Sequence, residues 1–280
     1  MNSAFIARDV ACGSATGRMY DYGAHVTAWA PRSEQPVIWM PRDVDLVDGE
    51  PIRGGIPVCF PWFGAGPDNT KRPMHGLARV SRWLLVDSFL DEEADTHQLT
   101  YRLTPKRLGR EDAQFEAIMQ VTFGRELDQV LTVTNTGEDD FVFEEAFHTY
   151  ISVGNAERVS VLGLDEANYL DWTVDDPTWQ RQDLELSFTG ETVDRVYDST
   201  SPITIEDPNN ARRIVLRKEN SASTIVWNPG VEGCRGKEGL AKDDWKHFLC
   251  VEIANCKSHT ITLEPGAKHE MRQTISIEHL

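Results

Sequence analysis

His148 has the sequence surroundings best suited to acid–base chemistry in this chain. It lies in the segment Phe147–Ile151, which has the alternation of a strand. Alternation puts His148 and Tyr150 on one face and Phe147 and Ile151 on the other. The second face is the natural core face, and the polar, aromatic first face is typical of a sugar-binding cleft. The alternative is a structural histidine on a solvated sheet face.

Glu252 is the second candidate, a lone carboxylate in the apolar segment Phe248–Ala254. Leu249, Val251 and Ile253 share one face of the expected strand, which leaves Glu252 on the opposite face. A carboxylate there is costly unless it is paired or solvated, and burial raises its pKa toward the range useful for general catalysis. The alternative is a glutamate paired with a nearby lysine or arginine.

Two arginines lie beside glycine-rich backbone. Arg53 belongs to the loop Pro51–Gly64, which carries three prolines and three glycines, and Arg79 ends the segment His75–Arg79. Glycine allows close approach of backbone to a ligand, and guanidinium donors suit phosphate or carboxylate. The pair therefore predicts a local pocket for a small anion. The alternatives are a tight surface loop packed by its own aromatics, and a strand start with a turn glycine.

Short strands are the elements that must position these residues. Turn chemistry recurs every ~8–12 residues, as in β-sandwiches and barrels, and strand–helix–strand alternation is missing. We expect an all-β fold, a large antiparallel β-sandwich, as a single domain over residues 1–280. Helical candidates are confined to 113–117 and 243–246. The expected strands are 83–86, 98–103, 117–123, 130–134, 141–153, 158–162, 213–217, 223–227, 248–254, 260–263 and 269–277.

Composition limits the partners. The chain has 280 residues, with 28 Lys and Arg against 45 Asp and Glu, a net charge of −17. This charge disfavours nucleic acids and anionic membranes as partners. The five cysteines are odd in number and lack C-x-x-C spacing, which favours a reducing compartment. We see neither a signal peptide nor an apolar run of ~20 residues, so we expect a cytoplasmic protein, with a monomer as the default.

Several kinds of active site have no motif here. The sequence contains no G-x-S-x-G, no H-E-x-x-H, no Walker A sequence and no G-x-G-x-x-G. We therefore expect no serine-hydrolase chemistry, no catalytic metal and no nucleotide or other cofactor.

Six segments occur in an order that resembles the D-hexose-6-phosphate mutarotases (glucose-6-phosphate 1-epimerases) of the aldose 1-epimerase-like superfamily. The resemblance runs from about Gly23 to Gly266. Each segment alone is weak, but the six together are a strong signal. They are Ile52–Pro57, His75–Arg79, Ala146–Tyr150, Val193–Tyr197, Trp227–Pro229 and Cys250–Glu252.

The resemblance implies a galactose mutarotase-like sandwich with a sugar site on a concave sheet face and metal-free interconversion of anomers. His148 would be the general acid and Glu252 the general base. Their surroundings would hold them in opposite protonation states. His75 would bond the sugar near the reacting centre, and Asp194 would accept hydrogen bonds from ring hydroxyls.

The resemblance also implies that Arg53 and Arg79 hold the 6-phosphate of a sugar phosphate, glucose 6-phosphate first. Trp62 or Phe63 would offer an apolar face to the ring. Some positions depart from the family pattern: Ile151, Asn155 and Gly230 differ, and the segment 230–240 is unusually rich in glycine. These departures leave the acid–base pair intact and bear on which hexose 6-phosphate fits.

Two other functions stay open from the sequence. An aldose 1-epimerase for unphosphorylated sugars has no need of two guanidiniums beside C6, so it gains if Arg79 points away from the cleft. A non-catalytic sugar-binding or sensing protein on the same scaffold has no need of an acid–base pair.

Overall fold

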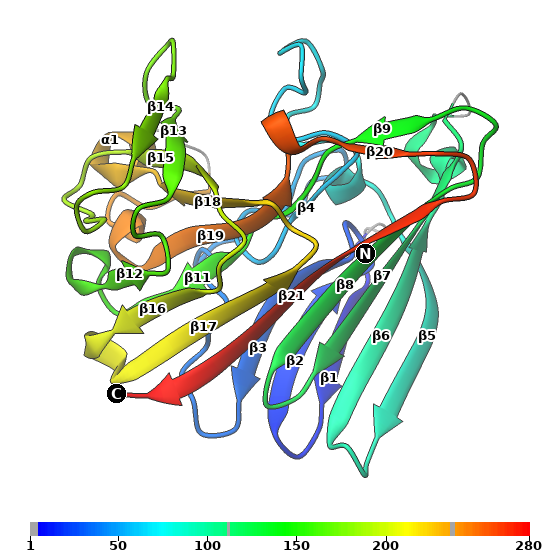
Figure 1. Ribbon diagram of the computed structural model, residues 1–280. Coiled ribbons are helices and arrows are strands. Elements are labelled where there is room, and N and C mark those ends of the chain that lie inside the picture. The colour runs from blue at the N-terminus through cyan, green and yellow to red at the C-terminus, as the bar shows by residue number, and fades with distance from the viewer. Residues whose placement is uncertain (1–4, 111–112, 236–238) are drawn as a thin grey trace.

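Alternating apolar residues build two large antiparallel sheets that share one core (Figure 1). The structure is a computed structural model and describes residues 5–110, 113–235 and 239–280. In β7 (Phe115–Phe123) every second side chain is buried, and these side chains belong to the core. The prediction of an all-β fold is confirmed.

The first large sheet carries the candidate residues. Its strand order is β14-β13-β15-β18-β19-β10-β4, and β11 also pairs with β19. The bounds are β4 Val58–Cys59, β10 Glu145–Phe147, β11 Tyr150–Ser152, β13 Asn168–Asp171, β14 Trp179–Arg181, β15 Val193–Asp198, β18 Ser223–Asn228 and β19 Phe248–Asn255.

The second large sheet crosses the front of the molecule in Figure 1 and has the order β12-β16-β17-β21-β8-β7-β6-β5. Its remaining strands are β5 Leu84–Asp91, β6 Thr96–Leu103, β8 Leu127–Asn135, β12 Ser160–Leu162, β16 Ile203–Asp207, β17 Arg212–Glu219 and β21 Lys268–His279.

Smaller elements complete the fold. A three-stranded sheet consists of β1 Ala7–Ala11, β2 Ala15–Tyr20 and β3 His25–Pro31. A two-stranded sheet consists of β9 Phe141–Phe143 and β20 Ile261–Leu263. The helices are α1 Gly230–Cys234 and the 3-10 turns η1 Ala78–Val80, η2 Pro105–Leu108, η3 Ala156–Arg158, η4 Pro208–Asn210, η5 Asp244–Lys246 and η6 Lys257–His259. No helix in the described ranges is long and apolar enough to cross a membrane.

The two faces of β19 have different roles. Leu249, Val251 and Ile253 enter the core between the sheets. Phe248 and Cys250 enter a second apolar cluster on the other face, and all eight residues of the strand are buried. The face opposite the core is therefore covered as well, and this face forms the floor of the candidate site.

Three expected elements differ. The helix expected at 113–117 is wrong, because Phe115 begins β7 and its alternating side chains pack on the core. The helix expected at 243–246 is only the single turn η5. The extended segment expected at 141–153 is divided into β9, β10 and β11, interrupted at Glu144 and at His148–Thr149.

A buried arginine ties the two large sheets together near the site. Arg212 of β17 is 1% exposed and lies 3.5 Å from the buried carboxylate of Asp207. Its Nη2 donates to the carbonyl oxygen of Ser152 in β11, at 2.8 Å, and its Nη1 donates to that of Gln35. β11 follows directly on His148 in the chain, so this network helps to fix the strand on which the site depends.

Candidate active site

Strand register brings His148 and Glu252 together. Phe147 lies opposite Ile253, and Tyr150 lies opposite Cys250, so the same register places His148 opposite Glu252. Side chains directly opposite each other in antiparallel strands have Cβ atoms about 4.5–5.5 Å apart. The result is a distance of 3.4 Å between His148 Nε2 and Glu252 Oε1.

One cavity of about 500 Å³ contains all six residues singled out in the sequence. It lies over the face of the first sheet that is turned away from the core. The six are Arg53, His75, Arg79, His148, Asp194 and Glu252. Aromatic rings frame His148: Tyr150 stacks on it at 5.0 Å, and Trp227 meets it edge-on at 6.0 Å. Phe63 also lines the cavity, whereas the Trp62 indole donates to the carbonyl of Pro73 in the neighbouring loop.

The surroundings of Glu252 make it a strong base. Its side chain is buried, and its Oε2 accepts no hydrogen bond from the residues the structure describes. Burial raises the pKa of Glu252 well above its usual range, repulsion by Asp194 raises it further, and Arg79 partly opposes this. The partner of Glu252 is His148 rather than a lysine or arginine.

His75 is held as a neutral donor. Burial, followed by repulsion from Arg79 and His148, lowers the pKa of His75 well below its usual range. Its Nδ1 accepts a hydrogen bond from the Gly64 N–H at 3.3 Å, so the ring proton lies on Nε2. The ring of His75 meets that of His148 edge-on at 5.6 Å. His75 can therefore donate a hydrogen bond to an oxygen atom close to His148 and Glu252.

Glycines without room for a side chain set the loops that carry Arg53 and His75. A Cβ on Gly55 would lie 2.3 Å from His25 Nε2, and one on Gly76 would lie 2.2 Å from the carbonyl oxygen of Phe60. Both glycines have positive φ angles, at 69° and 80°. Only glycine therefore fits at these two positions of the loops.

Both arginines line the cavity, so Arg79 does not point away from it. One guanidinium nitrogen of Arg79, Nη2, donates to the carbonyl oxygen of Met74 at 2.7 Å. Its Nε has no hydrogen-bond partner within the described chain. Burial lowers the pKa of Arg79, and repulsion by Arg53 acts in the same direction. The two cations thus line the same cavity.

Sequence reasoning missed several residues that line the site, among them Lys257 and Trp172. Both line the cavity, and Lys257 Nζ lies 4.2 Å from the centre of the Trp172 ring. They come from irregular segments without a motif, so no periodic signal points to them. The glycine-rich segment also reaches the site, since Gly239 lies beside the Arg53 side chain. Its residues 236–238 lie outside the described residues.

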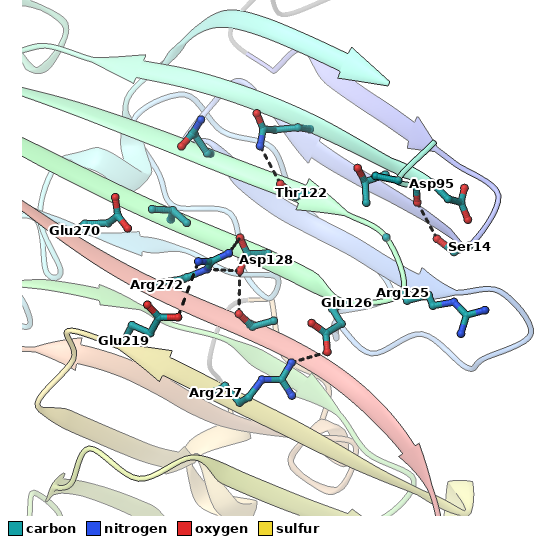
Figure 2. Close-up of a pocket in the computed structure, with 17 residues that line it drawn as sticks. Ser14, Asp95, Thr122, Arg125, Glu126, Asp128, Arg217, Glu219, Glu270 and Arg272 are labelled. Carbon is teal, nitrogen blue, oxygen red and sulfur yellow. Dashed lines mark hydrogen bonds and ion pairs between the residues drawn. The ribbon is translucent and has the colours of Figure 1, made fainter. Parts of the chain in front are cut away.

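A larger hollow of about 770 Å³ lies on the outer face of the second sheet (Figure 2). Two of its arginines are matched by carboxylates: Arg217 pairs with Glu126, and Arg272 pairs with Asp128. Exposed pairs of this kind are typical of a solvated sheet face. The smaller cavity instead combines buried titratable groups whose pKa values are shifted, which favours it as the functional site.

Comparison with known proteins identifies the family. The family model described as aldose 1-epimerase matches residues 13–276. A protein of Escherichia coli strain K12, provisionally named glucose-6-phosphate 1-epimerase, is 32% identical over 237 residues, which cover 83% of this chain and 77% of that protein.

Solved structures share the fold. A protein of Salmonella typhimurium, provisionally described as a mutarotase, superposes with a TM-score of 0.88 at 23% identity, covering 100% of this chain and 92% of the other. A galactose mutarotase-like protein of Clostridium acetobutylicum superposes with a TM-score of 0.71 at 15% identity, covering 100% of both chains. The predicted mutarotase-like sandwich is confirmed. By its sequence and its fold, the chain belongs to the aldose 1-epimerase family.

Proposed function

We propose that this protein interconverts the α and β anomers of a hexose 6-phosphate, with glucose 6-phosphate as the first candidate. The observation that carries the proposal is the placement of His148 opposite Glu252 on the floor of a cavity that also contains Arg53 and Arg79. The names of the relatives support the substrate class.

In the proposed mechanism Glu252 removes the proton of the C1 hydroxyl, and its raised pKa favours this transfer. The O1 electron pair forms the carbonyl while the C1–O5 bond breaks, and O5 takes a proton from His148. Rotation about C1–C2 presents the other face of the aldehyde. Closure reverses both proton transfers and gives the other anomer.

Other groups of the cavity hold the substrate in this scheme. His75 donates from Nε2 to a sugar oxygen near the reacting centre, and Asp194 accepts hydrogen bonds from ring hydroxyls. Arg53 and Arg79 bind the 6-phosphate, for which guanidinium forks are well suited. The same proposal holds that the protein is a cytoplasmic monomer, that it consists of one domain and that it needs no cofactor.

Anomer exchange followed by saturation-transfer NMR tests the proposal. We expect the protein to accelerate exchange of glucose 6-phosphate above the rate in buffer, with much less effect on glucose at the same concentration. Acceleration of glucose alone would identify an aldose 1-epimerase for free sugars. If neither sugar responds, a non-catalytic sugar-binding protein becomes the better explanation for these two ligands.

Replacing Asp194 with asparagine is expected to shift the pH dependence of kcat/KM to lower pH. Glu252 must lose its proton to act, so a raised pKa places the acidic limb of kcat/KM above the ordinary glutamate range. Because the charge of Asp194 contributes to this rise, Asp194→Asn should move the acidic limb to lower pH. A pH series of kcat/KM measures the shift. An unmoved limb would assign it to another group.

A further inference from the structure

Glu144 is a buried carboxylate beside the site that the proposed mechanism does not use. It is 1% exposed and interrupts the chain between β9 and β10. Each oxygen accepts one backbone N–H: Oε2 from Phe63 at 3.0 Å and Oε1 from Lys257 at 2.7 Å. One carboxylate therefore joins two loops that are far apart in the sequence, and both line the cavity.

The first of these loops determines which ring nitrogen of His75 carries the proton. Phe63 is followed by Gly64, whose N–H donates to His75 Nδ1 at 3.3 Å and whose carbonyl accepts from the His75 N–H at 2.6 Å. The Phe63 ring also meets the His75 ring edge-on at 4.7 Å. Holding Phe63 in place therefore keeps the Gly64 N–H on Nδ1, which leaves the ring proton on Nε2.

The second loop determines the direction of the Lys257 side chain. The residue has a φ angle of 59°, a left-handed conformation that a lysine seldom adopts. Such a conformation persists where the surroundings over-determine it, and the Glu144 bond to its N–H is one of these constraints. The side chain then extends over the Trp172 ring at one wall of the cavity.

We propose that Glu144 is a positioning residue that joins the Phe63 and Lys257 loops into one wall of the active site. It acts through His75, whose donor nitrogen it fixes, and through Lys257, whose ammonium it holds beside the substrate. This inference rests on the proposed function for its kinetic consequences, whereas its effect on His75 is independent of that function.

The neighbouring Glu145 provides a matched control. It is equally buried, and its Oε1 lies 2.9 Å from His269 Nε2 and accepts from Asn255. Asn255 is buried and His269 is partly exposed, and neither of them lines the cavity. A change at Glu145 therefore removes the same chemical group but leaves the hydrogen bonds of Phe63 and Lys257 to Glu144 in place.

The experiment compares Glu144→Gln and Glu145→Gln. The amide at 144 replaces one acceptor with an NH2 group that faces an N–H donor, so one loop loses its hydrogen bond. In protein whose histidine rings carry an NMR-active nitrogen isotope, the ring-nitrogen spectrum should show His75 with its proton on Nε2 in the wild type. It should show a mixture of the two tautomers in Glu144→Gln. The kcat/KM for glucose 6-phosphate should fall about tenfold, as for loss of one charge-assisted hydrogen bond. Glu145→Gln should leave the His75 tautomer and the kcat/KM close to those of the wild type, because neither loop loses a hydrogen bond to Glu144.

Two results would overturn the proposal. The first is a Glu144→Gln variant with an unchanged His75 tautomer and an unchanged kcat/KM. The second is a loss of kcat/KM in Glu145→Gln that equals the loss in Glu144→Gln. If Glu144→Gln does not fold, Glu144→Asp keeps the charge but is too short to reach both N–H groups, and the same readouts apply. A wild type that accelerates no anomer exchange refutes the proposed function, while the His75 tautomers still decide the role of Glu144.

Discussion

Glu252→Gln is expected to lower kcat for anomer exchange of glucose 6-phosphate by about 10²–10⁴-fold, the usual contribution of a positioned general base. The amide keeps the shape of the side chain and can still hydrogen-bond the sugar, but it cannot accept the proton of the C1 hydroxyl. The dissociation constant for glucose 6-phosphate, measured by calorimetry, should change little. Saturation-transfer NMR then measures the loss of exchange under saturating substrate.

The same variant should be no less stable than the wild type. Burial holds the pKa of Glu252 above its value in the unfolded chain, so the folded protein binds this proton more tightly. Ionisation of Glu252 therefore costs folding stability as the pH rises above about 4.3, the ordinary value. Glutamine carries no such cost, so Tm at neutral pH should equal or exceed that of the wild type.

One control variant and two outcomes decide this prediction. Glu145→Gln removes a buried carboxylate in the adjacent strand and should keep full exchange activity. If Glu252→Gln keeps its turnover, Glu252 is not the base. If neither the wild type nor the variant is active but both bind the sugar phosphate, the scaffold serves binding rather than catalysis.

The contact between His148 and Glu252 was predictable because it follows from strand alternation. Apolar residues at every second position assign Leu249, Val251 and Ile253 to the core, and this assignment forces Glu252 to the opposite face. The same holds for His148 beside Phe147. Once the two strands pair in register, the contact between His148 and Glu252 follows.

The walls of the cavity were less predictable because irregular backbone builds them. Lys257 depends on a left-handed φ and on a hydrogen bond to Glu144, which is 113 residues away in the chain. Alternation treats Glu144 as a position within one long strand, yet its carboxylate needs the loops on either side and interrupts that strand. Side chains that satisfy backbone groups of distant loops leave no periodic pattern in the sequence.

Arg53→Met is expected to separate phosphorylated from free sugar. Hydrogen bonds to charged groups contribute about 1.5–3 kcal/mol, so KM for glucose 6-phosphate should rise about tenfold to a hundredfold. Any exchange of unphosphorylated glucose should be unaffected, because glucose has no phosphate for the guanidinium to bind. Arg53 is the better first target, since Arg79 also holds the carbonyl of Met74 and its loss would disturb the loop.

The physical reason for this expectation lies in the two arginines themselves. They are close enough to repel, and repulsion by Arg53 adds to burial in lowering the pKa of Arg79. A phosphate dianion between them relieves that repulsion, whereas a neutral sugar does not. Arg181→Met is the matched control, because it removes an exposed arginine on β14 that pairs with Glu166 and should leave KM unchanged. Equal losses for glucose 6-phosphate and glucose in Arg53→Met would assign Arg53 to the sugar ring or to the loop, and the phosphate site would have to lie elsewhere.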